Sequence, residues 1–378
     1  MNYLTDIDAP PFWPDPARRP RRVVVGMSGG VDSAFAAWSL ARAGAEVIGI
    51  HFKMGDFGPA AAGVARCCSW EDARDARRVA DLLGVPLYVV SVADAFEREV
   101  IMPFARAYAS GLTPNPCIVC NPAVKWRELI KKAQEIGADA VSTGHHCRVI
   151  RDPGSGRPRL LRGRYEGKDQ SYFLARLSLD QLQWAVLPAG WFMKDVIRAA
   201  LRDAGIPIAL KPESQDVCFT GQGGYAAAVE RYLGTAPPPG EIVDAGGNVL
   251  GRHPGIHHFT IGQRKGLDLP GPRPHYVTAI DAALNRVVVG GEEDIFCREA
   301  VARDLHWLQD PPAPGEACQV KVRYQAAPAN ARVVMEGPRL RILFDHPQRA
   351  VTPGQAAVVY RGDEVRGGGI IAREGGSD

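Results

Sequence analysis

A glycine-rich run offers the first chemistry in this sequence. It reads Gly26-Met27-Ser28-Gly29-Gly30-Val31-Asp32-Ser33 and follows three valines, Val23–Val25, that predict a strand. Backbone N–H groups beside glycine can close around a phosphate, serine hydroxyls add donors, and a helix that begins here contributes partial positive charge. The run lacks the Gly-Lys-Ser/Thr of a Walker A loop and the Gly-x-Gly-x-x-Gly of a dinucleotide turn. We therefore predict an anion-binding loop rather than a mere tight turn.

Cysteines form the second chemical candidate. Cys117 and Cys120 follow the stiff segment Thr113-Pro114-Asn115-Pro116, and Cys218 lies much later in a polar stretch. A cysteine in such a context can be a metal ligand, or a nucleophile whose thiolate is stabilised by nearby cations or helix N-termini. A buried apolar filler is the simpler interpretation. We keep that interpretation for Cys147, Cys297 and Cys318.

The number of cysteines limits the roles that they can have. Eight cysteines are too few for a disulfide scaffold in a chain of 378 residues. In a reducing compartment, clustered cysteines are more often metal ligands or catalysts. Cys67 and Cys68 are adjacent, so their side chains cannot easily point at one metal ion. We interpret them as an uncommitted pair, with redox chemistry as one option.

A basic segment spans Arg148 to Lys168. Seven basic residues stand there against Asp152 and Glu166, a net charge of +5, whereas the whole chain carries +3. A local excess of this kind suits a phosphate or nucleic-acid surface, and an ordinary solvated arginine-rich loop is equally consistent with it. The chain has 36 Arg and 9 Lys, so the arginine bias also has a simple explanation in codon composition.

Apolar runs alternate with helical patterns through the first half of the chain. Strands are predicted at 23–25, 47–52, 87–92 and 140–143, and helices after Asp32 and at 69–83, 93–109 and 123–136. This order predicts an α/β fold with a doubly wound parallel sheet covered on both faces. Ligands of such sheets gather at the carboxyl ends of the strands. Both the glycine-rich run and Gly144-His145-His146 fall at such ends.

The pattern changes to short strands near Pro237-Pro238-Pro239-Gly240, after helices predicted at 191–204 and 224–233. Hairpins are predicted at 241–252 and 276–289, and short alternating strands at 319–324, 332–335, 339–344 and 356–360. These strands suggest a small antiparallel β-barrel. We divide the chain into a disordered tail (1–20), an α/β domain (21–225), a small mixed or β central domain (226–295) and a C-terminal barrel (296–374).

Composition excludes several classes of protein. Hydrophobic residues make up 46% of the chain and charged residues 23%, which are globular values. The 41 glycines and 30 prolines follow no period-three repeat, so a collagen-like chain is excluded. No apolar run approaches the roughly 18 residues of a membrane helix, and the N-terminus has acidic residues and prolines where a signal peptide has its apolar core. We expect a cytoplasmic protein with no membrane partner.

Further motifs complete an ordered set: Gly167-Lys168-Asp169-Gln170-Ser171-Tyr172-Phe173-Leu174, Val217-Cys218-Phe219, Ile261-Gly262-Gln263-Arg264-Lys265-Gly266-Leu267, Val322-Arg323-Tyr324 and Thr352-Pro353-Gly354-Gln355. With this order the chain closely resembles the bacterial tRNA-specific 2-thiouridylase family (MnmA) over Arg22 to Ile371. Its Ser28–Ser33 run looks like the pyrophosphate loop of the ATP pyrophosphatase superfamily. The resemblance implies an adenine nucleotide alpha hydrolase-like sheet, a central tRNA-binding domain and a C-terminal barrel.

The resemblance also implies a reaction, the 2-thiolation of the wobble uridine in tRNA anticodons. ATP adenylates the C2 oxygen, and a persulfide sulfur then displaces AMP. By resemblance Cys218 carries the persulfide and Cys120 attacks it, leaving a Cys120–Cys218 disulfide that a reductant reopens. The implied partners are tRNA and a persulfide donor protein. ATP and Mg²⁺ are the implied cofactors, with Asp32 as a metal ligand, although helix N-capping is its simpler role.

The binding residues of the family fall on matching positions of this chain. ATP would contact Gly26, Met27, Ser28, Gly29, Gly30, Val31, Asp32, Ser33, Phe52 and Gly144. The target base would lie at Asn115, Pro116 and Cys117. The tRNA surface would include His145, Lys168, Asp169, Gln170, Arg323, Tyr324 and Gln355. A strand-end hydrogen bond is the simpler interpretation of His145, and an exposed barrel edge that of Arg323 and Tyr324.

Cys117 departs from the family, which frequently has Asp there. Together with Cys120 and Cys218 it supplies three thiolates, the ligand count for an iron–sulfur cluster with one open iron site, and some related tRNA thiolases use such a cluster. The persulfide and cluster routes therefore both stay open.

Two other functions compete with thiolation. A pyrophosphate-loop ligase that adenylates another acceptor has no need of Cys120 and Cys218 together. A metal-stabilised RNA-binding module with a degenerate loop fits poorly with intact Ser28, Asp32 and Ser33.

Overall fold

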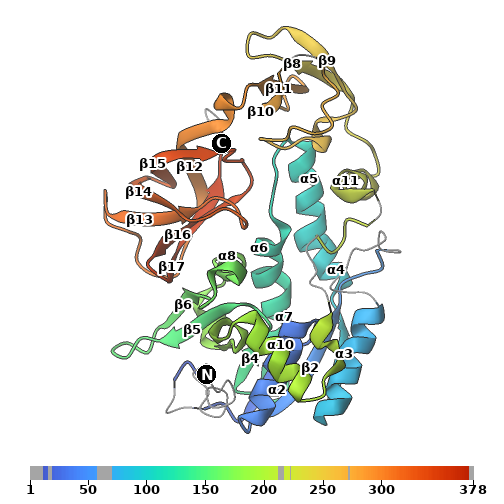
Figure 1. Cartoon of the computed structure of the whole chain (residues 1–378), viewed down its shortest axis with the longest axis vertical. Coiled ribbons are helices and arrows are strands. Elements are labelled where there is room, and N and C mark those ends of the chain that lie inside the picture. Colours follow the sequence, from blue (N-terminus) through green and yellow to red (C-terminus); the bar gives the residue numbers. More distant parts are fainter. Residues whose placement is uncertain are drawn as a thin grey trace. The chain divides into compact units, whose positions relative to one another are not determined.

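The structure is a computed structural model that describes residues 12–15, 19–57, 70–211, 217–221, 223–270 and 273–373. Contacts divide the chain into two compact units (Figure 1). The first comprises Met1–Glu99, Cys117–Cys218 and Asp363–Val365. The second comprises Val100–Pro116, Phe219–Gly362 and Arg366–Asp378. The expected central domain and barrel thus belong to one unit, together with a segment from the expected α/β domain.

A parallel sheet forms the centre of the first unit. Its strand order is β3-β2-β1-β4-β7, and each neighbouring pair is parallel. The strands are β1 (Arg22–Gly26), β2 (Glu46–Lys53), β3 (Leu87–Ser91), β4 (Ala140–Ser142) and β7 (Ala185–Val186). Strands covered on both faces are rich in branched apolar residues, as Val23–Val25 are. The prediction of a doubly wound parallel sheet is confirmed.

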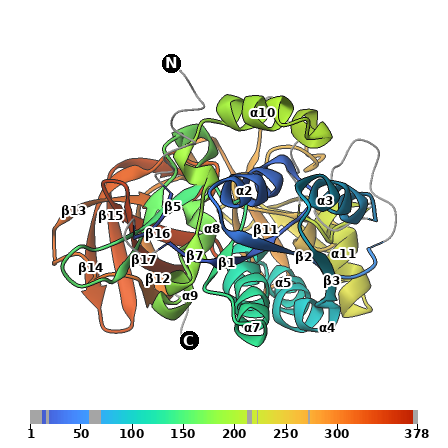
Figure 2. The same cartoon turned by 90° about the horizontal axis from the view of Figure 1, so that it is seen from below.

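Helices cover both faces of this sheet. α2 (Val31–Arg42) and α3 (Trp70–Leu83) pack on one face, and α7 (Arg127–Glu135) packs on the other (Figure 2). α10 (Lys194–Asp203) packs on α2. The shorter helices of the unit are α4 (Ala93–Phe96), η3 (Glu166–Lys168), α8 (Ser171–Leu174), α9 (Leu179–Gln183), η4 (Ala189–Trp191) and η5 (Pro207–Leu210). No helix in the described ranges combines the length and apolar character that a bilayer crossing requires.

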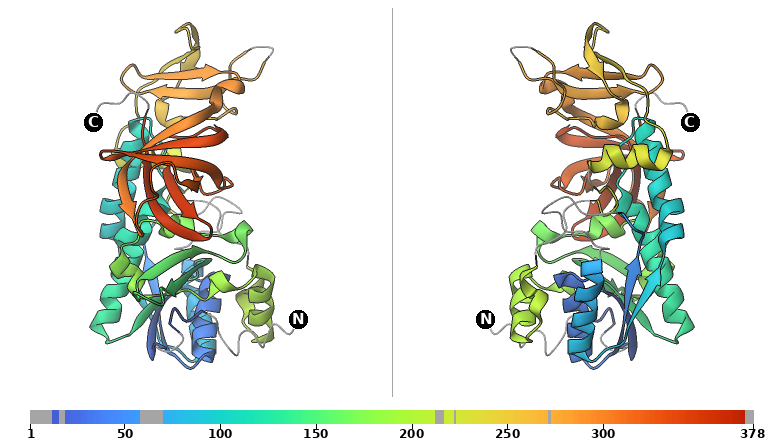
Figure 3. Two further views of the ribbon diagram at one scale, coloured as in Figure 1. Left: turned by 90° about the vertical axis from the view of Figure 1, so that its left-hand side faces the viewer. Right: turned by 90° about the vertical axis from the view of Figure 1, so that its right-hand side faces the viewer.

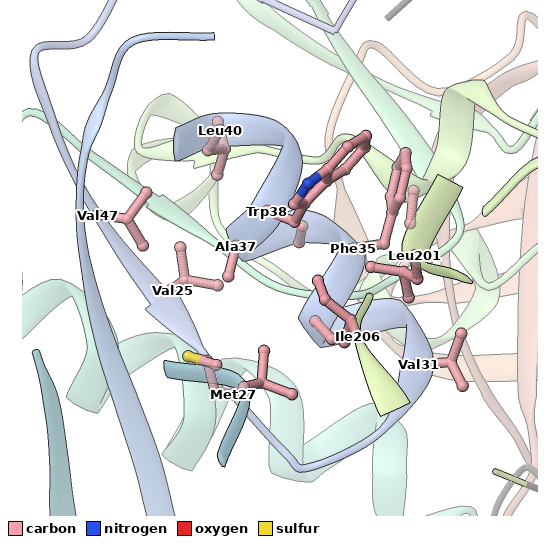
Figure 4. Packing of buried hydrophobic residues seen from close by; sticks show 14 of the residues in the cluster. Val25, Met27, Val31, Phe35, Ala37, Trp38, Leu40, Val47, Leu201 and Ile206 are labelled. Carbon is pink, nitrogen blue, oxygen red and sulfur yellow. The ribbon is translucent and has the colours of Figure 1, made fainter. Parts of the chain in front are cut away.

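The hydrophobic core of the first unit lies between the sheet and α2. Figure 4 shows Val25 and Met27 facing the α2 side chains, with Leu201 and Ile206 closing the cluster from α10 and its following turn. Phe12 and Trp13 also belong to this core and are almost fully buried. At these two residues the structure differs from the disordered tail expected over 1–20, because two large aromatic side chains among the prolines bury much apolar surface. Residues 1–11 and 16–18 lie outside the described residues, so the rest of that expectation stays a prediction.

The segment that carries Cys117 and Cys120 is helical. α6 (Pro116–Cys120) continues through a π-helical turn, η2 (Asn121–Trp126), into α7. We expected a stiff loop before a helix at 123–136, so the helix begins earlier than predicted. Pro116 suits the first turn of a helix, and Pro122 lacks the N–H that a regular α-turn needs, which accounts for the wider turn. A second π turn, η1 (Glu97–Ile101), joins α4 to α5 (Met102–Ala109), where one helix was expected at 93–109.

A hairpin stands where the sequence showed only a basic segment. β5 (Cys147–Arg151) pairs antiparallel with β6 (Pro158–Arg162), and Asp152 closes the turn by accepting N–H bonds from Gly154 and Ser155. Cys147, Val149 and Leu160 are buried, so the hairpin has an apolar face. Arginines on its other positions hid this alternation from the sequence pattern.

The second unit contains the two hairpins expected from sequence. β8 (Gly240–Val243) pairs with β9 (Val249–His253), and β10 (Tyr276–Asp281) pairs with β11 (Arg286–Gly290). β8 and β11 lie parallel and join the hairpins into one four-stranded sheet. α11 (Gly224–Leu233) has the bounds predicted for it. Two one-turn helices, η6 (Ile256–His258) and η7 (Glu293–Ile295), complete this part.

The C-terminal strands close into an antiparallel barrel (Figure 3). Its strands are β12 (Phe296–Trp307), β13 (Ala317–Lys321), β14 (Ala329–Glu336), β15 (Arg339–Arg349), β16 (Ala356–Arg361) and β17 (Glu364–Ile371). β12 pairs with both β15 and β17, which closes the ring and confirms the predicted barrel. β17 was missed because Gly367 and Gly368 break its pattern. Both have positive φ, and a Cβ on Gly368 would lie 1.9 Å from the Ala357 carbonyl oxygen, so the bend requires glycine.

Candidate active site

The glycine-rich run forms the turn between β1 and α2. The Ser33 hydroxyl accepts the Ser28 N–H at 3.2 Å and donates to the Gly30 carbonyl at 3.0 Å. Gly30 is the N-cap of α2, and no side chain caps the helix there. The first N–H groups of a twelve-residue helix therefore lack a side-chain acceptor, and the helix dipole adds positive charge at the same place. This is the arrangement that binds phosphate.

Two glycines allow other backbone segments to approach the loop. Gly29 has φ +78°, and a Cβ there would lie 2.2 Å from the Asp72 carbonyl oxygen on α3. A Cβ on Gly144 would lie 2.5 Å from the Ser33 nitrogen. Any side chain at either position would push a neighbouring backbone away. The predicted ATP residues Gly29 and Gly144 thus share a steric role in shaping the loop.

Asp32 is the most strongly perturbed acid of the site. His146 Nε2 lies 2.9 Å from its Oδ1, and the Lys194 ammonium donates to the same oxygen. Burial alone would raise the pKa of the Asp32 carboxyl, but the hydrogen bond and charge of His146 and those of Lys194 lower it from 3.8 to about 2. Asp32 is therefore a carboxylate near neutral pH, fixed at the first turn of α2.

The segment Asp169-Gln170 positions His146. Gln170 Oε1 accepts the His146 N–H at 2.9 Å, and the Gln170 N–H donates to the His146 carbonyl at 2.9 Å. The buried Asp169 carboxylate accepts from the Gly163 N–H and from both the N–H and the hydroxyl of Ser171. Both side chains, expected on a tRNA surface, here support the loop that reaches Asp32. Lys168, their neighbour, is half-buried.

His145 lies beside this loop and is half-buried. Its Nδ1 is 2.7 Å from the Thr143 hydroxyl. Burial, followed by the charges of Lys125 and His146, lowers the pKa of the His145 imidazole from 6.5 to about 3. A neutral imidazole can hydrogen-bond to a nucleotide but adds no positive charge.

Neighbouring strands and a second lysine complete the loop's surroundings. Phe52 is buried near the end of β2, and the preceding His51 Nδ1 lies 2.8 Å from the Met27 carbonyl oxygen. Lys211 Nζ lies 3.1 Å from the Gly29 carbonyl and bridges to Asp72 and Asp75. Burial would lower the pKa of Lys211, but the two carboxylates raise it, so it stays charged.

Sequence reasoning missed His146 as a site residue and missed both Lys194 and Lys211. The sequence did offer one indication for Lys194 and Lys211, because lysine is rare in this arginine-rich chain and both positions have lysine rather than arginine. These residues come from segments that are distant in sequence and meet only in the folded protein, so no local sequence pattern indicates that they converge.

Cys117 and Cys120 share one helix, and Cys218 lies on a separate segment. Cys117 is half-buried and Cys120 is 6% exposed, one helical turn apart on α6, and Cys218 is half-buried. Asn121 Nδ2 donates to the Cys117 carbonyl at 3.0 Å and to the Phe173 carbonyl at 3.3 Å, which ties α6 to α8. Cys67 and Cys68 lie outside the described residues.

The three thiols do not converge on a single metal ion. Within the described ranges, three ligating atoms lie within 4.8 Å of one another only at Glu230, His257 and His258. The sulfurs that hold an iron–sulfur cluster bind different irons and lie further apart, so this observation does not decide between the persulfide and cluster routes.

Most arginines of the basic segment have structural partners. Arg159 forms a two-pronged pair with Glu364, and Arg148 bonds Asp363 at 2.6 Å. Arg162 is 8% exposed, which differs from a solvated loop. Arg164 is exposed and stacks over Trp191 at 5.4 Å. An RNA surface here would therefore depend on Arg164 more than on Arg148, Arg159 or Arg162.

In the second unit, the loop before Asn115 is fastened to the barrel. Gln355 Nε2 donates to the Thr113 carbonyl at 2.6 Å, and the Thr113 N–H donates to the Pro353 carbonyl at 2.9 Å. Asn115 is half-buried and Pro116 is buried.

Arg323 and Tyr324 lie on the same barrel. Arg323 donates to the carbonyl of Ala350, and Lys321 lies over the Tyr324 ring at 5.3 Å. Both side chains are half-buried. At least part of the predicted tRNA set therefore also has a structural role.

Three family models together match most of the chain. The model described as "tRNA methyl transferase HUP domain" matches residues 21–222, the "tRNA methyl transferase PRC-barrel domain" model matches 226–291, and the "Aminomethyltransferase beta-barrel domain" model matches 297–371. The tRNA-specific 2-thiouridylase MnmA of Paramagnetospirillum magneticum is 44% identical over 378 residues, covering 98% of each chain. This chain belongs to the MnmA family. The MnmA proteins of Geobacter metallireducens (43%, 93% of this chain and 96% of that one) and Moorella thermoacetica (44%, 92% and 98%) agree.

Solved structures give much weaker likenesses. NMN synthetase from Francisella tularensis is 16% identical with a TM-score of 0.31, covering 57% of this chain and 78% of that one. A 4-thiouridine synthetase–RNA complex with bound ATP is 18% identical with a TM-score of 0.33, covering 56% and 50%. Scores this low add nothing to the family assignment.

The low pKa of His145 predicts a specific acid sensitivity. The folded imidazole protonates only near pH 3, whereas the unfolded one protonates near 6.5, so its contribution to stability is complete above pH 6.5 and falls as pH drops toward 3. His145→Gln should flatten the fall in the free energy of unfolding between pH 6.5 and 4.5, by at most about 1.4 kcal/mol per pH unit. Urea unfolding at several pH values measures it. His346→Gln, at an exposed barrel position, is the control, and equal slopes for all three proteins would contradict the prediction.

Proposed function

We propose that this protein catalyses the ATP-dependent 2-thiolation of the wobble uridine in tRNA anticodons. The observation that carries the proposal is an intact pyrophosphate-type loop, Gly26–Ser33, in a chain that matches curated 2-thiouridylases over as much as 98% of its length. A reaction that uses tRNA, ATP and a reductant belongs in the cytoplasm, where we place the protein.

The loop fits the phosphates of ATP. The uncapped N-terminus of α2 offers N–H donors, and Ser28 adds a hydroxyl. Lys194 and Lys211 bring two ammonium groups to the same loop, replacing the lysine that a Walker A motif would supply. ATP, when bound, supplies the adenylyl group that turns the C2 oxygen into a leaving group. Splitting between the α and β phosphates yields AMP and pyrophosphate.

Asp32 is the residue that would hold Mg²⁺. A single carboxylate together with phosphate oxygens is a common Mg²⁺ environment, and the Asp32 carboxylate is ionised near neutral pH. His146 and Lys194 share its Oδ1, so they compete with a metal ion for that oxygen. These partners would hold the carboxylate in place until nucleotide and metal arrive.

Sulfur transfer would use Cys218 and Cys120. A donor protein loads Cys218 as a persulfide, and the Cys120 thiolate attacks the Cys218 sulfur. The S–S bond of the persulfide breaks, a Cys120–Cys218 disulfide forms, and hydrosulfide is released. Hydrosulfide attacks C2 of the adenylated uridine, and AMP leaves with the former C2 oxygen. A cellular thiol reductant then reopens the disulfide.

The target base must leave its stack before C2 can be reached. Asn115, just before α6, and Pro116 and Cys117, in the first turn of α6, would receive it, close in sequence to Cys120 at the end of that helix. His145 would meet the tRNA as a neutral hydrogen-bonding group. Lys168, Arg323, Tyr324 and Gln355 complete the proposed tRNA surface.

The presence of Cys117 supports one alternative to the persulfide route, an iron–sulfur cluster. With Cys120 and Cys218, Cys117 would supply three ligands to an iron–sulfur cluster whose open iron accepts sulfide. We rank this route second, because the persulfide route needs only the two cysteines that the family resemblance covers directly.

The proposed reaction predicts separable effects of the two cysteines. Cys218→Ser and Cys120→Ser should each abolish 2-thiouridine formation, measured by mass spectrometry of tRNA nucleosides. Both should still release pyrophosphate from ATP and accumulate adenylated tRNA, because activation precedes sulfur attack, whereas AMP should no longer leave with thiolation. Cys297→Ser, a half-buried barrel cysteine, should behave like wild type.

Three results would contradict this scheme. Near-normal thiolation in either mutant would exclude the two-cysteine route, and ADP with phosphate as products would exclude the adenylating loop. Activity that depends strictly on reconstituted iron and sulfide would establish the cluster route instead.

The exposed arginine of the basic segment predicts a salt-dependent effect. Arg164→Glu should weaken tRNA binding and lower the slope of log affinity against log salt by about 1, as expected for one lost phosphate contact. Arg162→Glu is a poor probe of RNA binding, because Arg162 is buried and the substitution would place a carboxylate at its buried position. Filter binding at several salt concentrations measures the slope. Arg78→Glu, an exposed reversal on α3, is the control, and an unchanged slope for Arg164→Glu would place the RNA elsewhere.

A further inference from the structure

Two histidines and a glutamate cluster in the second unit, and none of the three is among the residues assigned to thiolation. Glu230 on α11 faces His257 and His258 of η6. Its Oε1 lies 2.9 Å from His257 Nε2 and 3.5 Å from His258 Nε2. Ligating atoms of all three residues lie within 4.8 Å of one another, and the described part of the chain contains no second group of this kind.

The spacing fits a tetrahedral metal ion. An ion bound about 2.0–2.1 Å from each ligand holds the ligand atoms about 3.3 Å apart. The two observed separations from Glu230 Oε1, 2.9 and 3.5 Å, bracket that value. Imidazole nitrogens favour Zn²⁺ and related transition ions over Mg²⁺ or Ca²⁺, which prefer oxygen ligands. Two histidines and one carboxylate would leave a fourth position for water.

The cluster is built before any ion binds. The Tyr225 hydroxyl, one turn or so before Glu230 on α11, donates to the His258 carbonyl at 2.9 Å, so the same helix fixes the backbone of η6. A Cβ on Gly255 would lie 2.5 Å from the His257 ring, so that ring packs directly over glycine.

Access also suits an ion. His257 is fully buried and its Nδ1 has no hydrogen-bond partner, while Glu230 and His258 are a little over one-third exposed, which leaves a route for an ion from solvent.

We propose that Glu230, His257 and His258 bind one divalent transition-metal ion, with Zn²⁺ as the best fit. The ion joins α11 to η6. Ile256 and Phe259, which flank the histidines, belong to the apolar core shared with β8, β10 and β11. Metal binding therefore stabilises this part of the second unit, and it is independent of the thiolation proposed above.

The test is a titration of the full chain with Co²⁺ and Zn²⁺. Cys117, Cys120 and Cys218 are replaced by Ser so that these thiolates do not compete. The protein should bind one Co²⁺ with visible d–d absorption and without the sulfur-to-cobalt charge-transfer band that marks thiolate ligands. Zn²⁺ should displace the Co²⁺ and raise the unfolding temperature.

Variants separate a metal site from a hydrogen-bonded cluster. Glu230→Gln can still accept a hydrogen bond from His257 but is a poor ligand, so metal affinity should fall at least about tenfold while metal-free stability stays near wild type. His258→Ala should weaken binding in the same way, and His346→Ala should not. No bound ion in the parent protein, or a metal affinity in Glu230→Gln and His258→Ala equal to that of the parent protein, would show that the three residues form only a hydrogen-bonded cluster.

Discussion

The interaction of the Asp32 carboxylate with His146 and Lys194 is the one on which the proposed site of the first unit depends. This carboxylate lies at the N-terminus of α2, with His146 from the loop between β4 and β5 and Lys194 from the start of α10 on the same oxygen. Three segments that are distant in sequence meet at one ion cluster. Without these partners the partly buried Asp32 carboxylate would lose its compensating charges, so each segment helps to hold the others. The same cluster leaves the helix N-terminus and two lysines directed at the phosphate loop.

Close backbone approach is the second constraint, and it explains why glycines recur around the site. Gly144 lies against the Ser33 backbone, and a Cβ on Gly190 would fall 1.9 Å from the Cys147 carbonyl oxygen. These contacts bring the loop after β4 and the hairpin β5–β6 onto α2 and η4. The loop residues are thereby ordered without a ligand, which lowers the entropic cost of binding one. In the second unit, Gly354 plays a similar part, because a Cβ there would lie 2.9 Å from the Thr113 nitrogen.

Local patterns in the sequence were enough to predict much of the fold. Valines followed by a glycine-rich run indicated β1, the phosphate loop and α2, and alternating apolar residues indicated both hairpins of the second unit and most barrel strands. The errors have physical causes. Phe12 and Trp13 pack into the core despite their proline-rich surroundings, arginines masked β5 and β6, and glycines required by a bend masked β17.

The site was harder to predict than the fold. Motifs identified the loop and the cysteines but could not show that Gln170 positions His146, or that Gln355 holds the backbone of Thr113. Such roles arise from tertiary contacts between residues far apart in the chain. A residue that a motif assigns to a ligand can therefore also be a support for its neighbours, and Asp169, buried with three donors on its carboxylate, is the clearest case.

A double-mutant cycle on Asp32 and Lys194 tests the central claim most directly. The rate of tRNA-dependent AMP formation is measured in Asp32→Asn, Lys194→Met and the double mutant, with circular dichroism to verify folding. If one ion cluster orders the loop, each single change should cost most of the activity and the double mutant should be little worse than the worse single mutant. Losses that simply multiply would show that the two residues act independently, and would contradict the account.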